Sequence, residues 1–132
     1  MILVDSNVLM YAAGADHPNK AAAVGFLEQV AAGEVVAAID AEVLQEIIHR
    51  YRALNRWTEG RRLYSLAREL FPEVLAVTGE VMDRAKEVID ADVSVSARDA
   101  LHAAVVAVYG LEGICTFARD FDRIRGCRRV GI

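Results

Sequence analysis

Residues 1–7 read Met-Ile-Leu-Val-Asp-Ser-Asn, and the order of residue types in this stretch indicates the architecture of the chain. The apolar run from Ile2 to Val4 shows no alternation with polar residues, which is typical of a short strand buried on both faces of a sheet. Asp5 ends the run, and a polar turn leads into a helix that contains Val8 and Leu9. We therefore expect a buried strand, a carboxylate at its end, and a helix that follows directly.

Short apolar runs followed by helical patterns recur along the rest of the chain. Further strands are predicted at residues 35–39, 74–77 and 113–116, with a short fifth strand at 130–132. Helices are predicted at residues 8–13, 19–32, 41–55, 58–70, 79–90 and 96–109, with Asp40 and Thr78 as N-caps. This alternation predicts an α/β fold with a central, mostly parallel sheet of four to five short strands, covered by helices on both faces.

The composition limits the classes of protein to which the chain can belong. A length of 132 residues suits one domain, and an apolar fraction of 55% argues against disorder. No apolar run approaches the roughly 20 residues that span a bilayer, so we expect a cytoplasmic protein. Cys115 and Cys127 form no C-x-x-C pair and are interpreted as small apolar fillers rather than zinc ligands.

Charge is distributed unevenly along the chain, whose formal net charge is −4. Residues 50–68 carry six arginines against one acid, and residues 119–129 carry five arginines against two aspartates. Arginine supplies 13 of the 15 basic residues and favours forked contacts with phosphate or carboxylate. The net charge argues against a nucleic-acid partner, whereas the two arginine-rich stretches suit either phosphate binding or ordinary solvated helix faces.

Two acids are expected at the starts of helices. Asp5 follows the first strand, at the edge of the sheet where open α/β folds bind ligands, although an Asp in such a turn is commonly a helix N-cap. Asp99, in the first turn of the helix predicted at 96–109, is also either a functional acid or a capping residue, because Ser96-Ala97-Arg98-Asp99 fits a capping box. Only His102 is polar between Ala100 and Tyr109, so this helix is expected to be buried on most sides.

Glu46 and Glu42 compete for a functional role in the helix at 41–55. At about 100° per residue the apolar positions of this helix form one stripe. Glu42 falls nearly opposite the stripe, whereas Glu46 lies on its shoulder, from which a side chain can reach into a cleft. The pattern favours Glu46, with an ordinary surface glutamate as the alternative.

Asp120 and Asp122 follow the strand at 113–116 and are further candidates, with a polar loop anchored by Phe117 and Phe121 as the alternative. Carboxylates brought together from several strands repel one another unless something positive lies between them. Mg²⁺ or Mn²⁺ with oxygen ligands is the natural neutraliser. Such an ion can activate water and stabilise the charge that develops on a phosphodiester.

Four segments together resemble the motifs of PIN-domain proteins, in particular the VapC-type toxins of toxin–antitoxin pairs. They read Met1-Ile-Leu-Val-Asp5-Ser-Asn7, Ala38-Ile-Asp-Ala-Glu-Val-Leu-Gln-Glu46-Ile47, Ser96-Ala-Arg-Asp99-Ala-Leu-His-Ala-Ala and Thr116-Phe-Ala-Arg-Asp120-Phe-Asp-Arg-Ile. The segments occur in order and at typical spacing along the whole chain. The resemblance implies a single PIN-like domain over residues 1–132, with a three-layer α/β/α fold.

The resemblance further implies a Mg²⁺- or Mn²⁺-dependent endoribonuclease. By position, Asp5, Glu46 and Asp99 would be the core acids. In the mechanism that we expect, Asp5, Asp99 and Asp120 hold the metal, and Glu46 orients or deprotonates the attacking water. Ala118 stands where many relatives carry an Asp, which leaves Asp120 to supply the fourth carboxylate and predicts one well-bound metal. The supporting residues carried over in the same way are Ser6, Asn7 and Thr116.

The partners implied by the resemblance are an RNA substrate, a cognate antitoxin and a second copy of the chain. An acidic pocket suits blockage by an Arg or Lys inserted from the antitoxin. For the homodimer, Leu54, Trp57 and Tyr64 are candidate surface residues, although helical spacing favours a core position for Leu54.

Two other functions remain as alternatives. A haloacid-dehalogenase-like phosphatase also places an Asp after its first strand, but its second Asp would stand where this chain has Asn7. A catalytically silent interaction module would use the acids to bind an arginine of a partner, and Ala118 favours this alternative.

Overall fold

The structure is a computed structural model that describes all 132 residues. In chain order its elements are β1 (Ile2–Val4), α1 (Ser6–Ala13), α2 (Lys20–Ala31), β2 (Ala37–Asp40), α3 (Ala41–Ala53), α4 (Trp57–Leu70), β3 (Val74–Leu75), α5 (Gly79–Ala91), α6 (Ala97–Val108), β4 (Ile114–Cys115) and the 3-10 helix η1 (Arg119–Arg123). The predicted strand and helix order is confirmed, and the bounds of the four strands differ from the prediction by at most two residues. None of the helices combines the length and apolarity needed to cross a bilayer.

The sheet has four strands in the order β3-β2-β1-β4, and every pairing is parallel. The predicted fifth strand at 130–132 is wrong. Arg129 forms only an isolated bridge with Ile114, supported by a hydrogen bond of 2.9 Å from the Val130 N–H to the Ile114 carbonyl. The ladder ends there because Gly131 has a φ of 91°, which turns the backbone away from an extended course.

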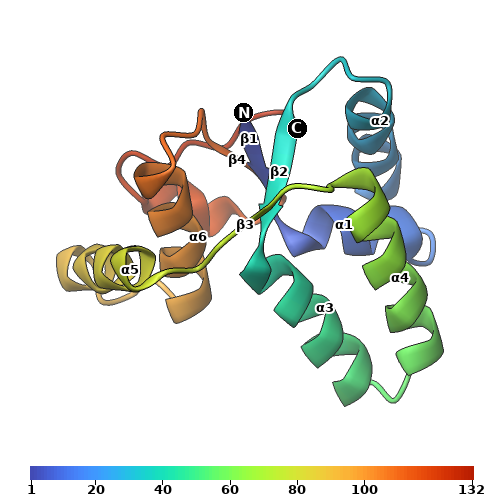
Figure 1. The fold of residues 1–132 in the computed structure, drawn as a ribbon, viewed down its shortest axis with the longest axis horizontal. Coiled ribbons are helices and arrows are strands. Elements are labelled where there is room, and N and C mark those ends of the chain that lie inside the picture. Colours follow the sequence, from blue (N-terminus) through green and yellow to red (C-terminus); the bar gives the residue numbers. More distant parts are fainter.

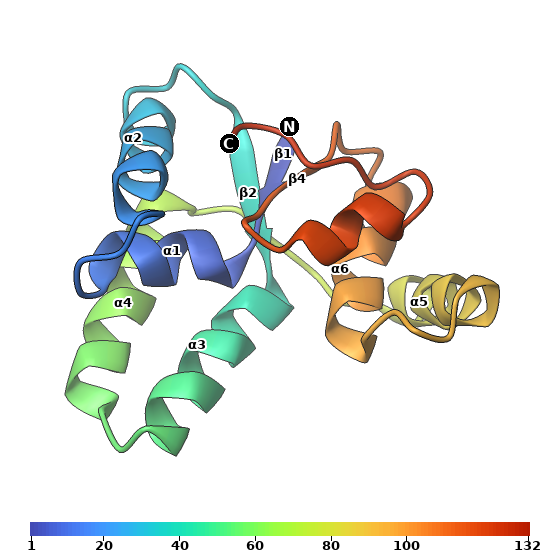
Figure 2. The same cartoon turned by 180° about the vertical axis from the view of Figure 1, so that it is seen from behind.

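Successive residues of each strand point to opposite faces of the sheet and so enter two different cores. Leu3, Ala38 and Ile114 pack with α5 and α6 on one face. Val4, Ile39 and Cys115 pack with α1 to α4 on the other face. Figures 1 and 2 show the resulting layers, with the short strands in the middle and the termini close together at one end. The predicted three-layer α/β/α arrangement is confirmed.

Side chains cap α3 and α5 at the positions where the sequence predicts their start. The N-H groups of Val43 and Val81 donate to the side chains of Asp40 and Thr78. These caps satisfy backbone donors that the first turn of a helix leaves free. They also fix where α3 and α5 begin, and hence which residues of α3 face the sheet edge.

Helices α3 and α4 form a long hairpin that extends beyond the sheet (Figure 1). Leu54, in the turn between them, is 45% exposed, so the core position favoured by helical spacing is wrong. The turn lies beyond the reach of either core, which leaves this side chain in solvent. Trp57 and Tyr64 are half-buried against the hairpin.

Candidate active site

The site lies at the carboxyl ends of β1, β2 and β4. Asp5 and Thr116 directly follow β1 and β4, and Asp40 is the last residue of β2. Strands β1 and β4 are neighbours although they are far apart in sequence, and an open sheet binds ligands at such a reversal of strand order. A groove of about 890 Å³ opens there. It is lined by the acids Asp5, Glu46, Asp99 and Asp120 and by the arginines Arg50, Arg56 and Arg98.

Asp5 is held by hydrogen bonds to both of its carboxylate oxygens. Oδ1 accepts from the Ser6 N–H at 2.7 Å, and Oδ2 accepts from Thr116 Oγ1 at 2.7 Å. The contact with the Ser6 N–H is also the N-cap of α1, so both sequence interpretations of Asp5 hold together. Burial raises the pKa of Asp5, although His102 and the Thr116 hydrogen bond oppose the rise.

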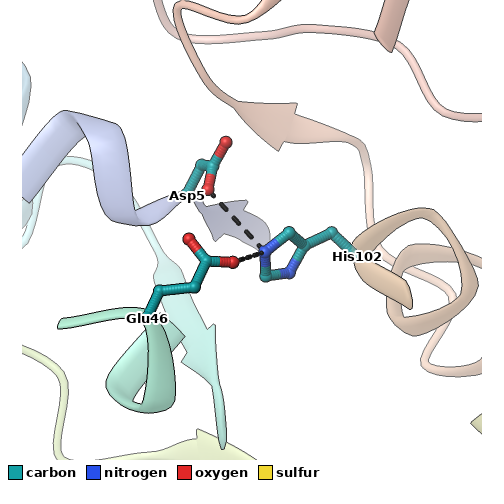
Figure 3. A group of neighbouring side chains, drawn as sticks. All are labelled: Asp5, Glu46 and His102. Carbon is teal, nitrogen blue, oxygen red and sulfur yellow. Dashed lines mark hydrogen bonds and ion pairs between the residues drawn. The ribbon is translucent and has the colours of Figure 1, made fainter. Parts of the chain in front are cut away.

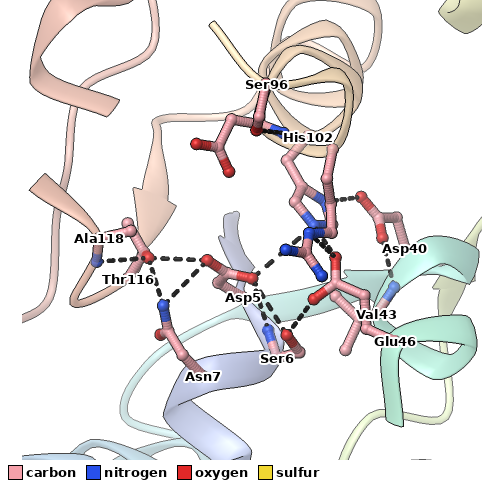
Figure 4. A network of polar contacts seen from close by, with 12 residues as sticks. Asp5, Ser6, Asn7, Asp40, Val43, Glu46, Ser96, His102, Thr116 and Ala118 are labelled. Carbon is pink, nitrogen blue, oxygen red and sulfur yellow. Dashed lines mark hydrogen bonds and ion pairs between the residues drawn. The ribbon is translucent and has the colours of Figure 1, made fainter. Parts of the chain in front are cut away.

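Asn7 and Thr116 join the ends of β1 and β4 around Asp5 (Figure 4). Asn7 Nδ2 donates to Asp5 Oδ2 at 3.2 Å and to Thr116 Oγ1 at 3.0 Å. The backbone N–H groups of Phe117 and Ala118 donate in turn to Asn7 Oδ1 and Thr116 Oγ1. The three residues that the sequence named as supporting, Ser6, Asn7 and Thr116, therefore all contact Asp5.

Glu46 faces the groove from α3 and is only 6% exposed. Val43, Leu44 and Ile47 pack into the core and thereby turn Glu46 toward Asp5. Ser6 Oγ donates to one carboxylate oxygen of Glu46. Glu42, by contrast, does not line the groove, although it is half-buried and not turned fully to solvent as the helix angles predict.

His102 lies between three carboxylates and is 1% exposed (Figure 3). Its Nε2 is 2.9 Å from Glu46 Oε1 and 3.7 Å from Asp5 Oδ1, and its Nδ1 is 2.6 Å from Asp40 Oδ2. Burial alone would lower the pKa of His102, but the hydrogen bonds to Asp40 and Glu46, together with the charges of Asp40 and Asp5, hold the pKa well above its ordinary value. His102 thus places a positive group within the acidic cluster.

Asp99 lines the groove from the first turn of α6. Its backbone N–H donates to the N-cap side chain Ser96 Oγ at 3.1 Å, so the residue takes part in the cap and also reaches the groove. Burial raises the pKa of Asp99, and the charge of Asp120 adds to the rise, while the Ser96 hydrogen bond, His102 and Arg98 lower it.

Asp120 and Asp122 lie in η1 and have different surroundings. Asp120 lines the groove. Asp122 is paired with Arg129, whose Nε and Nη2 donate to its two oxygens at 2.8 and 2.9 Å. Asp122 therefore binds Arg129 outside the groove, and Asp120 is the acid of η1 that lines the groove. Ala118 also lines the groove and brings no ligand atom there.

The family profile described as the PIN domain matches residues 2–126 of the chain. The chain belongs to the PIN-domain family. Ribonuclease VapC13 of Mycobacterium tuberculosis is 39% identical over 130 residues, which cover 98% of this chain and 99% of that protein. Ribonuclease VapC23 of the same species is 33% identical over 117 residues, covering 89% and 92%. Within the PIN-domain family, the chain therefore belongs with the VapC ribonucleases.

Solved structures agree with this fold. The chain aligns with VapBC2 from Rickettsia felis, a structure bound to a DNA fragment from its promoter, at a TM-score of 0.79 and 18% identity over 98% of both chains. It aligns with VapC20 of Mycobacterium tuberculosis, described as a sarcin-ricin loop cleaving toxin, at a TM-score of 0.71 and 23% identity, again over 98% of both chains. At these identities the likeness concerns the PIN fold.

Three residues of this PIN-domain site were not identified from the sequence. Asp40 was predicted only as an N-cap, and His102 only as the single polar residue of a buried helix. Arg98, within a quoted motif, places Nε 3.7 Å from Glu46 Oε1. The sequence contained one signal for the role of His102, which is the single polar residue of a helix expected to be buried. A buried polar side chain needs partners, and only acids were expected nearby.

Proposed function

We propose that this VapC-type ribonuclease cleaves RNA with a divalent metal ion held by Asp5, Asp99 and Asp120, while Glu46 acts on the attacking water. The observation that carries the proposal is the convergence of four acids on one groove. They come from the end of β1, from α3, from the first turn of α6 and from η1.

The donor atoms suit Mg²⁺ or Mn²⁺. Asp5 and Glu46 offer carboxylate oxygens within 4.8 Å of one another, whereas both ring nitrogens of His102 are engaged by carboxylates and are not free to bind a metal. Carboxylate oxygens are the ligands that hard divalent ions prefer, and both cysteines are buried in the cores. Burial raises the pKa of both Asp5 and Asp99, and a bound cation would favour their charged forms.

A bound divalent ion at this site would supply Lewis acidity, which activates water and stabilises charge on the phosphate. Glu46 is positioned to orient a water molecule and accept its proton, because Ser6 and His102 hold its two oxygens. Thr116 and the Ser6 N–H keep the Asp5 carboxylate in place. The proton of the attacking water thus has an acceptor on the wall of the groove.

The arginines of the groove provide contacts for the RNA backbone. Arg50 and Arg56 line it from the α3–α4 hairpin, and Arg98 lines it from α6. Each guanidinium can contact phosphate through two N–H groups. Binding of RNA is expected to weaken steeply as salt rises, since every neutralised phosphate releases counterions.

The function includes an inhibitory partner, because VapC ribonucleases are the toxins of toxin–antitoxin pairs. A solved toxin–antitoxin complex from Klebsiella pneumoniae matches the fold at a TM-score of 0.70 and 17% identity, covering 100% of this chain and 98% of that chain. We expect a cognate antitoxin to insert an Arg or Lys side chain into the acidic groove. A homodimer is proposed as well, and the exposed Leu54 now suits its surface.

The test combines cleavage and metal binding. Wild-type protein, Asp5→Asn and Asp99→Asn are incubated with RNA and Mn²⁺, with Asp83→Asn as the matched control, since Asp83 is exposed on α5 and does not line the groove. Only the control variant should cleave like the wild type, and calorimetry should show weaker Mn²⁺ binding for the other two variants. Cleavage by Asp5→Asn at the wild-type rate contradicts the proposal, and Mn²⁺ binding by an inactive wild-type protein supports the silent interaction module instead.

A further inference from the structure

His102 is buried beside the reacting groups, yet the proposed chemistry assigns it no step. It projects from α6 toward α3, and Figure 3 shows its ring directed at Glu46 and Asp5. Both ring nitrogens have partners, at 2.6 Å from Asp40 and 2.9 Å from Glu46. Neither ring nitrogen is available to solvent, since the side chain is 1% exposed.

His102 contacts two acids at the start of α3, one through each ring nitrogen. Asp40 uses one oxygen to cap α3 through the Val43 N–H at 2.9 Å and the other to contact His102. Glu46 lies further along the same helix and meets the opposite nitrogen of the imidazole. One imidazole therefore sets the distance between the start of α3 and the carboxylate of Glu46 (Figure 4).

The position of Glu46 is restricted from two sides as a result. Ser6 Oγ donates to Oε2, and His102 Nε2 meets Oε1. A glutamate side chain ordinarily samples many rotamers, and the carboxylate that acts on a water molecule must be held in one geometry. Residues that orient a functional group from behind have this effect in many sites.

We propose that His102 is a positioning residue for Glu46 and that Asp40 is its anchor. The proposal rests on the proposed function, because it needs Glu46 to act on the attacking water. The three residues come from α6, α3 and the end of β2, so the arrangement also couples the two sides of the groove. His102 does not contact RNA in this proposal.

The competing explanation is that the buried group only stabilises the fold. Removal of one partner from a buried charged network lowers stability in either case. The experiment must therefore compare variants of similar stability that retain different contacts. In His102→Gln the amide nitrogen takes the place of Nε2 and keeps the contact with Glu46. In His102→Asn the shorter amide takes the place of Nδ1 and keeps only the contact with Asp40.

The kinetic measurement compares kcat and KM for RNA cleavage with Mn²⁺ at a temperature where circular dichroism shows both variants folded. His102→Asn is expected to lower kcat by on the order of 10- to 100-fold with little change in KM. His102→Gln should restore most of this loss. Equal kcat values for the two folded variants, or a loss confined to KM, would overturn the proposal.

A second measurement does not depend on activity. The side-chain carboxyl carbon of Glu46 is observed by NMR in protein labelled with ¹³C-glutamate, and its resonance is assigned by its absence from Glu46→Gln. In His102→Asn the resonance should move toward that of the partly exposed Glu42, and in His102→Gln it should stay near the wild-type position. An unmoved resonance in His102→Asn overturns the proposal.

Glu46→Gln separates failure of the proposal from failure of the proposed function. If this variant cleaves like the wild type, the assigned role of Glu46 is wrong, whatever the His102 variants do. If Glu46→Gln is inactive and His102→Asn is fully active, only the positioning role is wrong. In the Glu46→Gln background, His102→Asn should cause no further loss of kcat.

Discussion

Thr116 Oγ1 donates a hydrogen bond of 2.7 Å to Asp5 Oδ2, and so joins the ends of two neighbouring strands 111 residues apart in sequence. The same hydroxyl oxygen accepts from Asn7 Nδ2 and from the Ala118 N–H. One side chain therefore orients the Asp5 carboxylate and satisfies two donors around it. Together with the Ser6 N–H and Asn7 Nδ2, this hydroxyl sets the orientation of a candidate metal ligand.

Replacement of Thr116 by valine keeps the shape of the side chain and removes the hydroxyl. We expect kcat to fall by on the order of 10- to 100-fold, because Asp5 loses a partner that holds it. The unfolding free energy should fall by about 1–3 kcal/mol, since buried polar groups are left unpaired. Thr116→Ser retains the hydroxyl and is the control in both the cleavage assay and denaturant unfolding. Equal kcat values for the valine and serine variants contradict the expectation.

Asp120 and Asp122 provide a matched pair two residues apart. Asp120→Asn is expected to weaken Mn²⁺ binding by roughly tenfold, because Ala118 offers no other ligand atom on this wall. Asp122→Asn removes only the exposed pairing with Arg129, which should leave Mn²⁺ binding unchanged and alter stability little. Calorimetry with Mn²⁺ measures both variants. A larger effect in Asp122→Asn would place the fourth carboxylate there instead.

Arg98 lies beside Glu46 and remains 58% exposed, which suits a contact with phosphate. Arg98→Ala is expected to raise KM for RNA and to reduce the salt slope of binding by about 1. Arg84→Ala on α5, where the arginine pairs with Glu87, is the control that should leave both values unchanged. Fluorescence anisotropy over a series of salt concentrations gives the slope. A fall in kcat at constant KM would show that Arg98 acts on Glu46 rather than on RNA.

Alanine substitutions at two helical glycines are expected to have opposite effects on stability. A Cβ on Gly60 would lie 2.4 Å from the Cβ of Tyr51, so Gly60→Ala should separate α3 from α4 and cost about 1–3 kcal/mol. A Cβ on Gly25 in α2 meets nothing within 4 Å, so Gly25→Ala should stabilise the protein by up to about 1 kcal/mol. Thermal unfolding measures both shifts. If the two variants move Tm in the same direction, the close packing of α3 on α4 is wrong.

Much of the fold could be predicted because its signals are local. The apolar run before Asp5 predicts a buried strand, and Asp40 and Thr78 cap helices where their positions indicate. Helix angles favour Glu46 over Glu42, since three apolar neighbours on α3 determine which way the glutamate faces. Each of these inferences depends on residues within a few positions of one another, where spacing and side-chain chemistry determine direction.

The remaining features depend on contacts between distant segments. His102 meets Asp40 across 62 positions of sequence, and Thr116 meets Asp5 across 111. Leu54 continues an apolar stripe but lies where the α3–α4 hairpin has left the sheet.

The succession of strands and helices and the acids at the strand ends can be predicted from near neighbours in the chain, because these set the local backbone geometry. The place of a histidine among the carboxylates depends instead on tertiary packing. That arrangement follows from the packing of α6 against one face of the sheet and of α3 against the other, so that their side chains meet at its carboxyl edge.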